Sequence, residues 1–183
     1  MGWMSIRLKE PVKEWFVKNI DENYTVLDVA IVHRNELYAA VKEKKSGNGL
    51  EVKISGLKGG HSGMEINKQR ANSNILMGRI LNHLLNHANI NLDLVQISGG
   101  AKNNAIPREA DAVILIDEKD EERLKEELNK ILNIFKNEFK TSDPKIEILC
   151  EKSHKTYNEA LKDDIRDKII ATIILMPSGI QNM

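Results

Sequence analysis

The apolar positions of this chain change period several times between residues 49 and 150. Residues 49–57 alternate apolar and polar side chains, and this two-residue period is typical of a half-buried strand. From about residue 68 to residue 87, apolar residues recur every three or four positions, which predicts an amphipathic helix. The same reasoning predicts strands over 92–98, 110–116 and 145–150 and a charged helix over 117–140.

The predicted element order, β-α-β-β-α-β, defines the fold class. This order, with two helices of this length, is typical of the ferredoxin-like split βαβ arrangement, which is an α+β fold. We therefore expect a four-stranded antiparallel sheet with both helices packed on one face. The opposite face then needs a cover, and residues 1–48, the C-terminal tail and a second copy of the chain are the alternatives.

The segments on either side of this core divide the chain into three parts. Residues 1–46 form an N-terminal extension of unassigned role that we expect to pack on the core, residues 47–156 form the ferredoxin-like domain, and residues 157–183 form a C-terminal helix and tail. The pattern also predicts a helix after Pro11, a strand over 24–33 with a hairpin partner at 37–41, a loop over 42–49 and a helix over 157–176.

Composition limits the cellular compartment and the kinds of partner that we expect. Of the 183 residues, 41% are hydrophobic and only 4% are aromatic, so the core is expected to be aliphatic. Lysine plus arginine totals 27 and aspartate plus glutamate totals 27, and this balance argues against a nucleic-acid partner. No stretch reaches the roughly 20 apolar residues of a membrane helix, and no apolar signal core begins the chain. We expect a soluble, cytoplasmic protein with no membrane partner.

Cysteine and histidine give little support for a metal site. The single cysteine, Cys150, excludes an internal disulfide and a cysteine-rich zinc site, and at the end of an apolar strand we expect a buried, unreactive thiol. His83 and His87 lie four residues apart on a predicted helix and could share one face. Without a third ligand, we interpret them as solvated or interfacial side chains.

A glycine-rich stretch, Gly59-Gly60-His61-Ser62-Gly63, is too flexible to predict regular structure and carries a histidine. Glycines let the backbone approach a ligand closely, and the imidazole could then donate a hydrogen bond to an oxyanion. The alternative is a tight turn with an exposed histidine. A second stretch holds Asn104 shortly before Pro107, and by itself it predicts an ordinary turn over 103–108.

Two long motifs resemble a known family. The phrases GLKGGHSGMEINKQRANSNIL and ISGGAKNNAIPREADAVILID, and the tail ILMPSGI, resemble the aminoacyl-histidine dipeptidases of the zinc aminoacylase and carboxypeptidase G metallopeptidase superfamily. The resemblance runs without interruption over residues 47–183, and residues 1–46 show none.

The resemblance implies a catalytic domain with two zinc ions and an inserted lid or dimerisation domain. The metal ligands of the family include a His-x-Asp motif in the catalytic domain, and this chain has no such motif. The chain therefore looks like the first half of the lid, with no metal ligand or cofactor of its own and zinc implied only for the full-length family. The pair Glu121-Glu122 lies on a charged helix and is interpreted as surface ion pairing.

The resemblance also implies roles for particular residues. His61 matches the lid histidine that contacts the scissile carbonyl oxygen, and Asn104 matches an asparagine that helps bind substrate. Gly59, Gly60 and Gly63 would shape the loop that carries His61. The implied function is part of a metal-dependent dipeptidase that cleaves Xaa-His dipeptides, inactive alone and dimeric, with a catalytic domain or chain as a further partner. The alternative is a stand-alone, non-catalytic interaction or self-assembly module.

Overall fold

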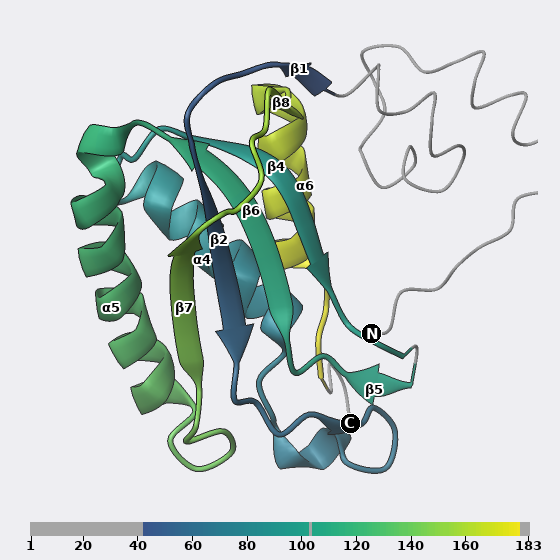
Figure 1. Ribbon diagram of the computed structural model, residues 1–183. Coiled ribbons are helices and arrows are strands. Elements are labelled where there is room, and N and C mark those ends of the chain that lie inside the picture. Colours follow the sequence, from purple (N-terminus) through teal and green to yellow (C-terminus); the bar gives the residue numbers. More distant parts are fainter. Residues whose placement is uncertain (1–41, 103, 180–183) are drawn as a thin grey trace, which may run out of the picture.

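The computed structural model describes residues 42–102 and 104–179, and its centre is a four-stranded antiparallel sheet. The strand order is β4-β6-β2-β7, which is the order of the predicted ferredoxin-like fold (Figure 1). The four strands are β2 (Asn48–Ser55), β4 (Leu92–Gly99), β6 (Ala110–Ile116) and β7 (Glu147–Lys152). The predicted fold class is thus confirmed.

Helices cover one face of this sheet. The alternation in β2 directs Leu50, Val52 and Ile54 to that face, where all three are buried. Figure 1 shows α4 and α6 behind the sheet and α5 beside β7. The helices are α4 (Ser73–Asn86), α5 (Glu121–Glu138) and α6 (Asp163–Leu175), with short 3-10 turns at η1 (Ile66–Lys68) and η2 (Glu118–Asp120). None of these described helices is long and apolar enough to cross a membrane.

Helix α4 begins five residues later than the sequence pattern predicts. Gln69 has φ 49° and ψ 40°, a left-handed conformation that interrupts the helical path after η1. Asn72 then caps α4, because its side-chain oxygen accepts a hydrogen bond from the Asn74 amide at 3.0 Å. The cap, rather than the apolar stripe, sets the start of the helix.

The predicted helix over 157–176 is wrong at its start. Residues Glu159–Leu161 form strand β8, which pairs with β1 (Lys42–Lys44), so the predicted loop over 42–49 is wrong there as well. Ala160 and Leu161 are buried by this arrangement. Helix α6 begins only at Asp163, where two aspartates in the first turn complement the positive end of the helix.

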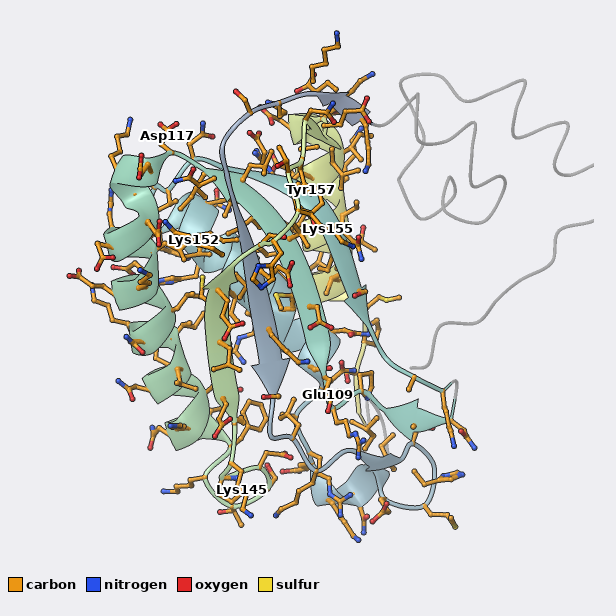
Figure 2. All side chains as sticks on the ribbon, in the orientation of Figure 1. Glu109, Asp117, Lys145, Lys152, Lys155 and Tyr157 are labelled. Atoms are coloured by element: carbon orange, nitrogen blue, oxygen red, sulfur yellow. The ribbon has the colours of Figure 1, made fainter. Side chains whose placement is uncertain are left out.

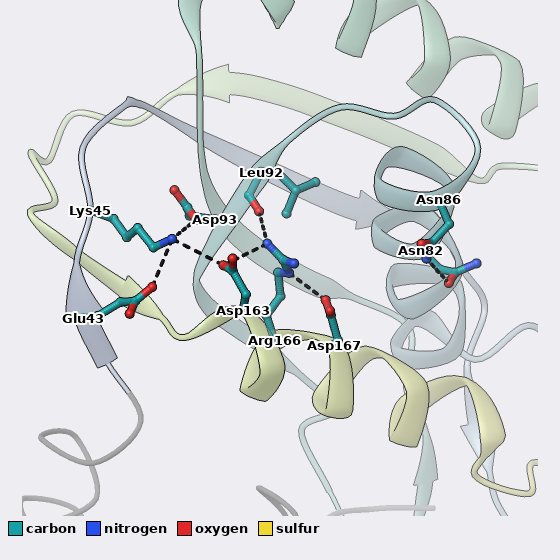
Figure 3. A network of polar contacts seen from close by, with 9 residues as sticks. All are labelled: Glu43, Lys45, Asn82, Asn86, Leu92, Asp93, Asp163, Arg166 and Asp167. Atoms are coloured by element: carbon teal, nitrogen blue, oxygen red, sulfur yellow. Dashed lines mark hydrogen bonds and ion pairs between the residues drawn. The ribbon is translucent and has the colours of Figure 1, made fainter.

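A polar network fastens α6 and the segment after β1 to strand β4 (Figure 3). The buried Arg166 guanidinium donates to the carbonyl oxygen of Leu92 at 2.8 Å and pairs with Asp163 and Asp167. Lys45 contacts Asp93 at 3.1 Å and Asp163 at 3.3 Å. The pKa of Lys45 is raised by hydrogen bonds to Glu43 and Asp93, so Lys45 stays charged.

Among the described residues, only a small cluster covers the face of the sheet opposite the helices. Near β8, Tyr157 packs with Val95, Val113, Leu115 and Ala160 in a small second cluster in front of the sheet (Figure 2). Helix α6 packs on the helical face against α4, so of the C-terminal part only the segment around Tyr157 and Ala160 contributes to this cover. The predicted elements in residues 11–41 lie outside the described residues.

Candidate functional site

The two motif segments that resemble the dipeptidase family meet in space. Gly60–His61 (β3) pairs antiparallel with Ala105–Ile106 (β5), and the Ser62 amide donates to the carbonyl oxygen of Asn104 at 3.0 Å. The predictions of no regular structure around His61 and of a plain turn over 103–108 are therefore wrong for these residues. Pairing between segments more than forty residues apart in sequence produces a short ribbon at one end of the main sheet.

The hydrogen bonds of the His61 ring determine which ring nitrogen carries the proton. Its Nδ1 atom accepts from the backbone amides of Gly63 at 3.1 Å and Met64 at 3.2 Å. A nitrogen that accepts two N–H donors carries no proton, so the proton of the neutral ring lies on Nε2. His61 is half-buried, and its Nε2 is the ring atom able to donate to a ligand.

Glu65 holds the backbone of the same loop. Its carboxylate accepts from the His61 amide at 3.0 Å and pairs with Lys68 at 2.6 Å and with Arg70 at 3.1 Å. The bond from Lys68, and then that from the His61 amide, lower the pKa of Glu65 to about 2. Arg70 also donates to the carbonyl oxygen of Gly59, so one ionic cluster spans the loop.

Backbone conformation explains why two positions in the loop are occupied by glycine. Gly59 has φ +61° and Gly60 has φ +148°, both in the region that favours glycine. A Cβ atom on Gly60 would lie 2.4 Å from Nη1 of Arg70, inside the ionic cluster. For Gly63, an added Cβ would lie 3.4 Å from the His61 ring, which is ordinary contact.

Asp143, which sequence reasoning missed, joins the two ends of the loop. Its carboxylate accepts from the Lys58 amide and from the Ala71 amide, each at 2.8 Å. Its exposed fraction is 0%. In the sequence, the phrase Thr-Ser-Asp-Pro is ordinary turn chemistry, and no local signal indicates partners 85 and 72 residues away.

A cavity of about 370 Å³ lies beside the loop. Both motif segments reach its wall, through Ser62 and Ile106, and the far side is closed by α4, the end of α5 and Ser178. Arg79, also in the wall, is neutralised by two hydrogen bonds to Glu138 at 3.0 and 2.7 Å. The side chain of Asn104 is exposed and is absent from the lining of this cavity.

The other candidate residues form no metal centre. Within residues 42–102 and 104–179, no group of three or more histidine, cysteine or acidic side chains is arranged to hold a metal ion. His83 bonds to Glu127 at 2.7 Å and stacks on His87 with ring centroids 5.7 Å apart. Burial raises the pKa of the Cys150 thiol to about 11, which disfavours the reactive thiolate. Glu121 pairs with Lys125 and Lys152, as the surface interpretation expects.

A model of the peptidase dimerisation domain matches residues 52–143, which is half of the chain. The chain therefore belongs to the peptidase dimerisation domain family.

Relatives make the resemblance more specific. The chain is 35% identical over 132 residues to the cytosol non-specific dipeptidase of Escherichia coli (strain K12), a match that covers 72% of this chain and 26% of the relative. It also superimposes on the crystal structure of aminoacylhistidine dipeptidase from Vibrio alginolyticus with a TM-score of 0.72 and 28% identity, covering 78% of this chain and 29% of that one. The predicted resemblance is confirmed, and the chain spans about a quarter of the curated relative's length.

Proposed function

We propose that this chain is the lid and dimerisation portion of a metal-dependent dipeptidase that hydrolyses Xaa-His dipeptides. The observation that carries the proposal is the His61 ring, because its Nδ1 is occupied by two amides and its Nε2 proton is left for a ligand. The pairing of this loop with the Asn104 segment gives further support. The names of the two dipeptidase relatives supply the substrate class.

In this proposal His61 acts on the scissile carbonyl group. As the carbonyl carbon is attacked, its oxygen gains negative charge, and the Nε2 proton of His61 stabilises that charge through a hydrogen bond. Asn104 would contribute its side-chain amide to substrate binding. The positive φ angles of Gly59 and Gly60 allow the compact loop that presents the ring, and a loop-shaping role of Gly63 stays a prediction.

In this proposal, zinc is held by a catalytic domain that lies outside the described residues. The donor atoms needed for a zinc site are not grouped anywhere within residues 42–102 and 104–179. When bound in a catalytic domain, zinc would polarise the carbonyl group and activate water. We accordingly propose that the chain alone is inactive, that it forms a homodimer, and that it acts in the cytoplasm with a catalytic domain or chain.

The test compares the isolated chain with a chimera. The isolated chain, supplied with zinc or manganese, is expected to show no Xaa-His hydrolysis and no stoichiometric bound metal. Residues 47–183, placed in the matching position of the E. coli dipeptidase, are expected to support turnover. His61→Ala should then lower kcat by about 10²-fold to 10³-fold, the typical cost of losing one oxyanion donor.

The matched control is His154→Ala, because His154 is exposed and lies outside the loop of residues 59–70 that carries His61. It should leave kcat unchanged. Turnover by the isolated chain with bound metal, or a chimera indifferent to His61→Ala, would contradict the proposal. Self-association with no activity in either form would instead favour a non-catalytic self-assembly module.

A further inference from the structure

Asp143 is a buried acidic side chain held by amide groups. It lies in the turn between α5 and β7, and its exposed fraction is 0%. Its carboxylate partners among the described residues are the backbone amides of Lys58 and Ala71, each at 2.8 Å. A buried carboxylate is costly unless it is hydrogen-bonded, so these two bonds account for its presence there.

The two amides stand at opposite ends of the segment that carries His61. Lys58 immediately precedes residues 59–70, which we term the His61 loop, and Ala71 immediately follows them. One oxygen of Asp143 receives the first amide and the other oxygen receives the second. The carboxylate therefore fixes the distance between the two ends of the loop.

Asp143 is itself held in place by the sheet and α5. Its amide donates to the carbonyl oxygen of Phe139 at 2.8 Å, and its carbonyl oxygen accepts from the Ile146 amide at 3.3 Å. The turn also touches the end of β2, because a Cβ atom on Gly56 would lie only 1.8 Å from the carbonyl oxygen of Lys145. Through Asp143, the His61 loop is therefore attached to the end of the main sheet.

We infer that Asp143 is the positioning residue of the His61 loop, fixing the ring that the proposed function uses as its oxyanion donor. The inference rests on that proposed function for its catalytic meaning, and its structural content can be tested separately. The two amides contact different oxygens of the carboxylate, and in an asparagine side chain one of those two positions is an NH2 group, which cannot accept a hydrogen bond. Asp143→Asn therefore removes one anchor at almost constant volume.

The experiment measures hydrogen exchange and histidine nitrogen chemical shifts by NMR on the full chain. In Asp143→Asn, the amides of Lys58 or Ala71 and those of the His61 loop are expected to exchange at least tenfold faster. The His61 nitrogen shifts are expected to move from a single Nε2–H form toward a mixture of both tautomers. A general loss of stability would not by itself change that tautomer signal.

Two controls define the outcome. Asp111→Asn makes the same chemical change at an exposed aspartate of β6, on the face of the sheet that the helices do not cover. Ile114→Val weakens the core of the sheet away from the His61 loop. The inference would be overturned if the loop amides of Asp143→Asn exchange within twofold of their rates in both controls and the His61 tautomer is unchanged. If Asp143→Asn does not fold, the test is made on the unaltered chain. There, NMR scalar couplings across the hydrogen bonds from the Lys58 and Ala71 amides to the Asp143 carboxyl carbon are measured, and the absence of these couplings would overturn the inference.

This outcome is independent of the chimera assay. A loop that loosens in Asp143→Asn while His61→Ala leaves turnover unchanged would sustain the positioning role and refute the proposed function. A loop that is unaffected by Asp143→Asn, together with turnover that falls in His61→Ala, would refute the positioning role and support the proposed function.

Discussion

At Gly56, both the backbone conformation and the space around the residue require glycine. It has φ +78°, and an added Cβ would lie 1.8 Å from the carbonyl oxygen of Lys145. Gly56→Ala is expected to reduce the free energy of unfolding by at least about 2 kcal/mol, from left-handed strain and overpacking together. Urea unfolding followed by circular dichroism measures this loss.

Gly179 is the matched control for that substitution. It has a similar φ of +82°, and nothing lies within 4 Å of an added Cβ. Gly179→Ala should therefore cost far less than Gly56→Ala. Equal losses in both variants would show that the contact with Lys145 contributes nothing.

Glu65 gives the His61 loop a defined dependence on pH. The pKa of Glu65 in the folded chain is about 2, below its ordinary value of 4.5. A lowered folded pKa means that the ionised carboxylate stabilises the loop above pH 4.5 and that this contribution is lost as the pH falls toward 2. NMR titration of the Glu65 carboxyl carbon should show a midpoint near 2, and Glu65→Gln should abolish the loop's response in this range. A midpoint near 4.5 would contradict the ion-pair geometry.

Single residues also show what the sequence can and cannot reveal about the site. His61 and Asn104 can be predicted because each lies in a long motif that is visible in the sequence, and their roles in a site stay predictions. Asp143 was missed because its partners are backbone amides, which have no sequence signature, and because they lie 85 and 72 residues away. The role of Glu65 depends on the folded path of the loop, which the glycines leave undetermined in the sequence.

Among the elements, α6 depends on one buried cation. Arg166 donates to the carbonyl oxygen of Leu92 in β4, and its neighbours Asp163 and Asp167 belong to the same helix. Arg166→Ala removes this donor from a buried carbonyl group and should lower the free energy of unfolding by about 1–3 kcal/mol. Hydrogen exchange should localise the loss to α6 and to the adjacent end of β4.

Lys168→Ala is the control on the same helix. Lys168 makes an i,i+4 ion pair with Asp164 at 3.3 Å on a partly exposed surface, and such pairs contribute little. If both variants lose the same stability, the bond to Leu92 does not fasten the helix.

Element prediction succeeded where the signal was local. The strand over 110–116 was predicted at its observed bounds, and α5 differs only at its ends, where η2 replaces the first turn. The failure at 159–161 has a different cause, since those residues become a strand by pairing with β1, far away in the chain. Periodicity reports which face is apolar, and it carries no information on such a partner.

At the level of the whole molecule, the described sheet ends in two edge strands, β4 and β7. Strand edges carry unpaired backbone groups that favour association with another strand, and a two-fold dimer is the commonest closed assembly. We expect sedimentation equilibrium to give twice the chain mass at micromolar concentration. A single monomeric species across the whole concentration range would refute the dimer.

The strand order β4-β6-β2-β7 has a consequence for the way the chain can be divided. Strands β2 and β4 belong to residues 42–102, β6 and β7 belong to residues 104–179, and every adjacent pair in the sheet joins one half to the other. Cut at residue 103, neither piece retains a single ladder of the main sheet, so each needs the other in order to fold. The two pieces are therefore expected to behave as a complementation pair, and their reassembly would report on the proximity of any proteins fused to them.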